Sequence, residues 1–213
     1  MKFMKRVIVV AAASLSLVSS AFAGSGIFGS YVAIDADGPG SAVLTWYGAQ
    51  QAGSNQLTAF DQLNLGSFAM GSQAYIAGAE IETYKNSGSD VTGATLFYRV
   101  DTGAWQNASI GFTANSSFAN AAGNTFSGDG DQKWAQLSNT GIDFLSGVGV
   151  GQHTLQIYFG AGSTDGNHYS NNAGSNFQAN FEVAAVPEPS SYAMLGLGLA
   201  VMGMVYRRRR EQR

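Results

Sequence analysis

The sequence predicts an all-β body, an antiparallel β-sandwich of Ig-like or jelly-roll-like type, flanked by an N-terminal signal peptide and a C-terminal single transmembrane helix. Three observations carry this prediction. Several short segments alternate apolar and polar residues with a period of two, glycine-rich turns separate them, and no long amphipathic helix lies between the two ends. Eight or nine short strands of this kind are typical of a sandwich.

Residues 1–23 have the order of a signal peptide. The basic stretch "MKFMKR" precedes the apolar run "VIVVAAASLSLVSS", and Ala21 and Ala23 then supply the small residues of a cleavage site. We expect export by the general secretion machinery and cleavage by signal peptidase after Ala23. The alternative is a membrane-spanning anchor, for which the apolar run is short.

The expected body, 24–185, is a single domain. Turn sequences such as "DADGPG", "NSGSD", "SGDGD" and "STDGN" separate its strands. The segment "GIDFLSGV" suggests a helical turn. In chain order, the segments expected to form strands are 30–34, 42–47, 65–68, 79–85, 94–100, 105–112, 133–137, 153–159 and 176–183.

The alternation predicts which side chains of these strands are buried. In "NFQANFEV", Phe177 and Phe181 share one face with Ala179 and Val183, and the polar residues lie opposite. In "AEIETYK", the same rule exposes Glu80 and Glu82. Both carboxylates are therefore expected to be solvated, and two acids on one strand face are badly placed to flank a glycosidic bond.

Part of the body resembles a known class of module. The "-YRV-" strand of "ATLFYRV" and the later strand "GQHTLQIYF" are similar to strands that pack together in bacterial extracellular immunoglobulin-like modules. The resemblance covers about 79–183. It supports the fold and implies no particular activity.

Charge is strongly segregated along the chain. The whole sequence has a formal net charge of −3, but the body carries three basic and twelve acidic residues, a net charge of roughly −9. Nucleic acid is therefore excluded as a partner, because phosphate binding needs clusters of Lys and Arg. The sequence has no cysteine, which excludes thiol catalysis, thiolate metal sites and disulfides.

The C-terminal tail, 186–213, has three parts. Two prolines in "VPEP" prevent regular strand pairing, an apolar segment follows, and four consecutive arginines come after it. We expect a transmembrane helix over about 191–206. It is a short span, and the arginines would hold its end in the cytoplasm. Its three glycines favour recognition and release over permanent anchoring.

This order of elements resembles the PEP-CTERM sorting signal of exported proteins from Gram-negative bacteria. The resemblance implies cleavage by an exosortase, a membrane-embedded cysteine transpeptidase-like enzyme. It assigns recognition to Pro187, Glu188 and Pro189, and the membrane stop to Arg207, Arg208, Arg209 and Arg210. A plain single-span anchor after a proline linker is the alternative.

No catalytic constellation stands out in the body. His153 is expected at a strand edge and His168 in a loop; a zinc site is improbable, and no "G-x-S-x-G" elbow is present. No cofactor is predicted. The only metal candidates are weak calcium ligands in two glycine turns, and each pair is better explained as part of a turn: Asp35 with Asp37 and Asp129 with Asp131.

The function expected from these features is non-enzymatic. The protein would pass transiently through the inner membrane and reach the cell surface or exopolysaccharide matrix, with a structural or adhesive role in a biofilm or floc. The alternative is a carbohydrate-binding lectin-like module, possibly calcium-assisted, and a secreted hydrolase is a third, weaker candidate. Aromatic residues that would stack on sugars if exposed are Trp46, Trp105, Trp134, Tyr158 and Tyr169.

Overall fold

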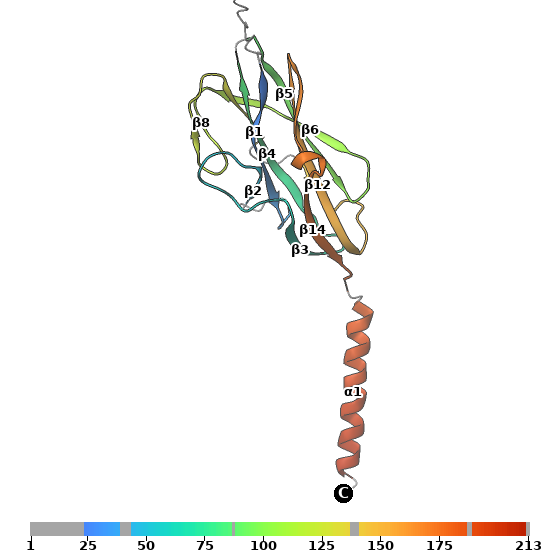
Figure 1. Cartoon of the computed structure of the whole chain (residues 1–213). Coiled ribbons are helices and arrows are strands. Elements are labelled where there is room, and N and C mark those ends of the chain that lie inside the picture. The colour runs from blue at the N-terminus through green and yellow to red at the C-terminus, as the bar shows by residue number, and fades with distance from the viewer. Residues whose placement is uncertain (1–23, 39–43, 87, 137–140, 187–188, 212–213) are drawn as a thin grey trace, which may run out of the picture.

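The computed structural model describes residues 24–38, 44–86, 88–136, 141–186 and 189–211 (Figure 1). Two six-stranded sheets form the body, and a two-stranded ribbon lies beside the first of them. A single helix, α1 (Pro189–Glu211), follows the last strand. The all-β prediction is confirmed at this level. The predicted signal peptide, 1–23 with Ala21 and Ala23, lies outside the described residues, as do Pro187 and Glu188.

The first sheet, called sheet A, is built around β4. Its strands in spatial order are β2 (Thr45–Gln50), β1 (Ser25–Asp35), β4 (Tyr75–Lys85), β10 (Asp131–Gln136) and β7 (Phe112–Asn115), and β11 (Ile142–Asp143) also pairs with β4. The two-stranded ribbon consists of β8 (Phe118–Ala119) and β9 (Thr125–Phe126).

The second sheet, called sheet B, is built around β12. Its strands in spatial order are β3 (Leu63–Ala69), β14 (Phe177–Ala184), β12 (Gly151–Ser163), β5 (Val91–Val100) and β6 (Gln106–Ile110), and β13 (Gly166–Ser170) also pairs with β12. A short 3₁₀ turn, η1 (Asn172–Gly174), joins β13 to β14.

The prediction of an antiparallel sandwich needs one correction. β3 pairs with β14 in the parallel sense. The preceding strand, β2, belongs to sheet A, so the chain crosses to the other sheet before β3 begins. A strand reached by such a crossover is free to run parallel to its neighbour, whereas a tight hairpin would force the antiparallel sense.

The strand predicted over 105–112 is two strands. β6 pairs with β5 in sheet B, whereas β7 pairs with β10 in sheet A. Gly111 stands between them, so the chain changes sheets at a residue without a side chain. The sequence analysis also missed four short strands, β8, β9, β11 and β13, and the helical turn expected at 141–148 is instead β11 followed by turns.

The core lies between the two sheets. Leu155, Ile157 and Phe159 of β12 are fully buried, as the alternation of that strand predicts. β14 buries its four predicted apolar residues in the same way. The contiguous apolar cluster and its partly buried neighbours all belong to residues 27–183, and α1 contributes none of them. The body therefore completes its core without the tail.

Candidate functional site

The outer face of sheet A buries two carboxylates that the sequence analysis placed in solvent. Glu80 and Glu82 of β4 are both 0% exposed, so the prediction that they are solvated is wrong. Alternation does put them on the face opposite the core residues Ala79 and Ile81, but this face is covered. Asn120, between β8 and β9, is part of the cover. Strand periodicity indicates the direction of a side chain and not what lies over it.

A salt bridge connects the acidic pair to β10. The ammonium of Lys133 lies 2.8 Å from Oε2 of Glu80, and it also donates to the backbone carbonyl of Ala119 at 2.6 Å. Oε1 of Glu80 accepts the backbone N–H of Ala121 at 2.8 Å. These contacts hold the β8–β9 segment against sheet A, because each member of the buried ion pair also hydrogen-bonds to the backbone of that segment.

The second carboxyl of the pair lacks such a partner. Burial and the adjacent Glu80 carboxylate raise the pKa of Glu82 to about 8, because both disfavour its charged form. Burial also raises the pKa of Glu80, although Lys133 opposes that shift. At neutral pH Glu82 therefore keeps its proton, which limits the negative charge buried beside the Glu80–Lys133 salt bridge.

A tyrosine hydroxyl and an asparagine amide complete the cover. The hydroxyl of Tyr31 accepts the backbone N–H of Ala52 at 3.1 Å and the side-chain amide of Asn120 at 2.9 Å. Oδ1 of Asn120 accepts the backbone N–H groups of Ala122 and Asn124. The cluster is thus tied into two covering segments, and its enclosure favours a structural role over catalysis.

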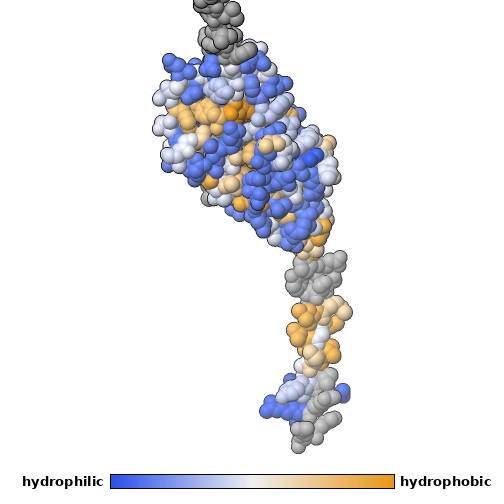
Figure 2. Space-filling model, in the orientation of Figure 1, coloured by the Kyte–Doolittle hydropathy of each residue, from blue (hydrophilic) through white to orange (hydrophobic). Residues whose placement is uncertain are grey.

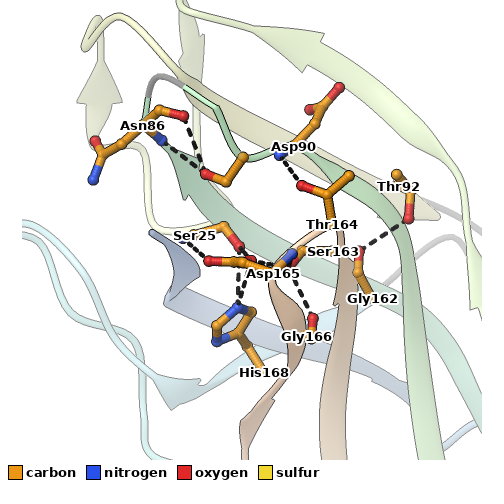
Figure 3. Close-up of polar contacts among 11 residues, drawn as sticks. Ser25, Asn86, Asp90, Thr92, Gly162, Ser163, Thr164, Asp165, Gly166 and His168 are labelled. Carbon is orange, nitrogen blue, oxygen red and sulfur yellow. Dashed lines mark hydrogen bonds and ion pairs between the residues drawn. The ribbon is translucent and has the colours of Figure 1, made fainter. Parts of the chain in front are cut away.

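A serine, a histidine and an aspartate meet at the end of β1 (Figure 3). Ser25 donates its backbone N–H and its hydroxyl to the carboxylate of Asp165, at 2.9 and 2.5 Å. Nε2 of His168 lies 3.0 Å from the same hydroxyl and 3.3 Å from Asp165. A catalytic relay requires the aspartate to bind one imidazole nitrogen while the serine binds the other. Here Nε2 of His168 faces both Ser25 and Asp165, so the three residues do not form such a relay.

His168 is not in a loop, as the sequence analysis expected, but in β13, where it pairs with Ala161 of β12. His153 lies close to the start of β12, as expected, and pairs there with Phe181 of β14. Its Nδ1 lies 2.8 Å from the carboxylate of Asp101, and this contact raises its pKa. Both histidines link neighbouring segments of the sandwich.

The four weak calcium candidates form two separate turns. Asp35 accepts the backbone N–H of Asp37 at 3.1 Å, and Asp131 accepts that of Gly128 at 3.2 Å; Asp129 lies in the second turn. Asp35 pairs with one end of β4 and Asp131 with the other, so the two turns are far apart. Within the described residues, no three metal-binding side chains gather.

The outer face of sheet B carries a row of aromatic side chains, called the aromatic row: Phe97, Trp105, Tyr158 and Tyr169. Phe97 and Tyr158 are cross-strand partners whose rings are stacked, with centroids 4.5 Å apart and an angle of 4° between the ring planes. Trp105 and Tyr169 approach Tyr158 edge-on, with ring centroids at 4.8 and 6.1 Å. The sequence analysis singled out five aromatic residues as possible sugar contacts. Three of them lie together in this row: Trp105, Tyr158 and Tyr169.

The remaining two tryptophans lie in sheet A. Trp134 is buried and donates its indole N–H to the hydroxyl of Thr83 at 3.1 Å. Trp46 of β2 is partly buried beside Gly78. Phe97 was not selected from the sequence, although its place opposite the buried Leu96 in "ATLFYRV" was a usable signal.

A groove of about 250 Å³ adjoins the aromatic row. Gly160 of β12 lies between Phe97 and Tyr169, and a Cβ at this position would come within 3.2 Å of the Phe97 ring and 3.4 Å of the Tyr169 ring. The glycine therefore keeps the space between the two rings open. The other lining residues are Thr92, Gly93, Thr95, Ala161, Gly162 and Asn167.

The tail is a helix with an apolar first part and a basic end. Figure 2 shows the hydrophobic segment of α1 outside the largely hydrophilic body, with hydrophilic residues at its far end. Met194, Leu195, Leu197 and Leu199 are all about 60% exposed or more. Pro189 is the first residue of α1, and Arg207 to Arg210 lie in its last turns.

The helix is confirmed, but its predicted membrane-spanning character over 191–206 is not. Within the described part of the chain, no helix combines the length and the apolarity needed to cross a membrane. Three glycines dilute the apolar segment, and four arginines occupy the end of the helix.

Comparison with known protein families identifies this tail. Residues 185–210 match the PEP-CTERM protein-sorting motif. The match covers the prolines, the apolar part of α1 and the arginines together, so the predicted resemblance is confirmed. A search of curated proteins found no match to the chain. The chain is therefore a β-rich protein with a C-terminal sorting motif, and the motif implies an exosortase-targeted surface protein.

Proposed function

We propose that this protein is a non-enzymatic exosortase substrate that is exported, cut near Pro187–Pro189 and delivered to the cell surface or exopolysaccharide matrix. The single observation that carries the proposal is the sorting motif at 185–210. The exosortase is its processing partner, and the secretion machinery and signal peptidase act earlier.

The start of the body supports the export step. β1 begins at Ser25, directly after the expected cleavage point at Ala23. The carbonyl of Gly24 accepts the backbone N–H of Asn86 at 3.0 Å, and Ser25 is held by Asp165. Residues from Gly24 onward are thus part of the folded body, which fits a mature chain that starts there.

The character of α1 suits a temporary membrane contact. Its exposed apolar residues favour insertion, and its glycines weaken both apolarity and helix propensity. The arginines at its end would stay with the cytoplasmic lipid headgroups. The helix would keep the chain at the inner membrane until the exosortase cuts before it.

After release, the body is proposed to act in adhesion or matrix structure. Its strongly acidic charge keeps it soluble and disfavours binding to polyanions. A carbohydrate-binding role is favoured by one observation, the glycine-floored groove beside the aromatic row.

The test compares the producing strain with a strain that lacks its exosortase. We expect the parent to display or release the protein and the mutant to retain it in the inner-membrane fraction. The variant Pro187→Ala/Glu188→Ala/Pro189→Ala should stay in the inner-membrane fraction even in the parent strain. Ser190→Ala/Ser191→Ala is the matched control and should be sorted normally. Equal surface display in both strains would contradict the proposal.

A further inference from the structure

The outer face of sheet B has the composition of a saccharide-binding surface. Alternation puts Thr154, Gln156 and Tyr158 of β12 on the face opposite the core, next to Gln178 and Asn180 of β14. Amides and hydroxyls there can exchange hydrogen bonds with sugar hydroxyls, while aromatic rings present flat apolar faces to the C–H groups of a sugar ring.

The groove has a suitable size and floor for one sugar ring. Its volume, about 250 Å³, is near the low end of small-molecule sites. The floor is backbone at Gly160 and Gly162, which lets a ligand approach the strand closely. Phe97 and the 53% exposed Tyr169 flank it, and Thr95 and Asn167 provide polar groups.

The charges point to a neutral ligand. The residues that line the groove include no Asp, Glu, His, Lys or Arg. The nearby Arg99 is engaged, because its guanidinium lies 4.4 Å from the Trp105 ring centroid and donates to Oε1 of Gln156 at 2.9 and 3.2 Å. An anionic polymer would therefore meet an acidic body with no free cation in this groove.

The same composition separates the groove from calcium-dependent sugar sites. Calcium needs several oxygen ligands that include carboxylates, and no Asp or Glu lines the groove. The candidate calcium residues Asp35, Asp37, Asp129 and Asp131 belong to sheet A and its turns. Binding at the groove is thus expected to be independent of calcium.

We propose that the groove over Gly160, flanked by Phe97 and Tyr169, binds single sugar rings of a neutral polysaccharide chain. The inference rests on the proposed surface or matrix location and specifies the ligand that the body meets there. One small groove gives weak binding, but many copies of the protein on a repeating polymer would bind it with avidity.

The experiment uses the body, residues 24–186, whose core is complete without α1. Its migration is measured in native gels that contain hydroxyethylcellulose, xyloglucan or glucomannan, with alginate as the anionic comparator. We expect at least one neutral polymer to retard the body and alginate not to retard it. The retardation should be unchanged by EDTA and by about 0.5 M NaCl. Salt at roughly this concentration screens surface charges within a few Å.

Four variants locate the site. Tyr169→Ala and Gly160→Val should weaken retardation roughly tenfold, a loss of about 1.4 kcal/mol in binding free energy. Phe112→Ala is the matched control, because Phe112 is 54% exposed but lies in β7 of sheet A. Thermal unfolding shows whether each variant is folded, and Tyr169→Trp, which keeps an aromatic face, should retain binding.

Three results would overturn the proposal: no retardation by any of the neutral polymers, binding that EDTA or salt abolishes, or groove variants that bind as tightly as wild type. None of these results would affect the sorting proposal, because the body used here lacks the tail. Conversely, a failure of exosortase processing would leave the binding result unchanged.

Discussion

The two sheets of the sandwich differ in what lies over their outer faces. On sheet A, the outward residues Tyr31, Glu80, Glu82 and Lys133 are covered by the β8–β9 segment and all are buried. On sheet B, the aromatic row remains partly or largely exposed. The same strand alternation therefore produced a buried ionic cluster on one face and an open aromatic surface on the other.

The two outer faces therefore differ in what they can contribute to the protein. The covered face gains contacts that fix the β8–β9 segment, but it has to neutralise two carboxylates to do so. The open face leaves apolar rings in contact with water, which contributes little to folding. The first arrangement is expected to matter for stability and the second for binding.

The largest expected effect is on the covered face. Lys133→Met leaves the buried Glu80 without its ion-pair partner, and we expect a loss of about 3–5 kcal/mol in the free energy of unfolding. Urea unfolding of the body at pH 7 measures it. Lys85→Met is the matched control, since the Lys85–Asp90 pair is exposed, and it should cost less than about 1 kcal/mol. Equal losses in the two variants would mean that the cluster is not structural.

The second effect is a pH dependence. The pKa of Glu82 is raised from 4.5 to about 8 in the fold. Between these two pH values the native state therefore keeps a proton that the unfolded chain has released. The stability contributed by neutral Glu82 is therefore fully present at low pH, and falls as the pH rises from about 4.5 toward 8 and stays low above it. His153, whose pKa is also raised, adds a loss of the same sign as pH rises through its folded value.

Glu82→Gln isolates the carboxyl contribution. It keeps the size of the side chain but cannot ionise, so the variant should be more stable than wild type at pH 9 by about 1–3 kcal/mol and should show a flatter pH profile. Urea unfolding between pH 5 and 9 is the measurement. Glu182→Gln, at an exposed position of β14, should leave the profile unchanged. A wild-type body that gains stability between pH 6 and 9 would contradict the assignment.

The last prediction contrasts two tyrosine hydroxyls, one of which has the smallest expected effect. Tyr31→Phe on the covered face leaves the backbone N–H of Ala52 and the amide of Asn120 without this acceptor, at a cost of about 1–3 kcal/mol. Tyr169→Phe on the open face should change stability by less than about 0.5 kcal/mol, because the side chain is exposed. Differential scanning calorimetry of both variants tests this order, and the reverse order would undo the contrast between the faces.

Local pattern was sufficient for much of the fold. The alternation in β12 and β14 correctly predicted their buried residues, because both strands lie in one sheet with a single core face. The tail was also identified, since prolines, apolar run and arginines are contiguous in sequence. Contiguous signals of this kind do not depend on how distant segments meet.

The errors come from contacts between distant segments. Glu80 and Glu82 were expected in solvent because nothing near them in sequence shows that residues 118–126 cover them. The meeting of Ser25 with His168 spans 143 positions and had no local signal. The groove likewise needs Phe97 of β5 and Tyr169 of β13, which only the sheet brings together. The Pro187-Glu188 part of the motif lies outside the described residues, and its role stays a prediction.

The most direct test of the sorting account is the intact mass of the protein recovered from the surface or culture medium. We predict a chain that begins near Gly24 and ends in the Pro187–Pro189 region, without α1 and its arginines. Protein from a strain without the exosortase should still carry the tail to Arg213. A full-length tail on the surface protein of the parent strain would contradict the account.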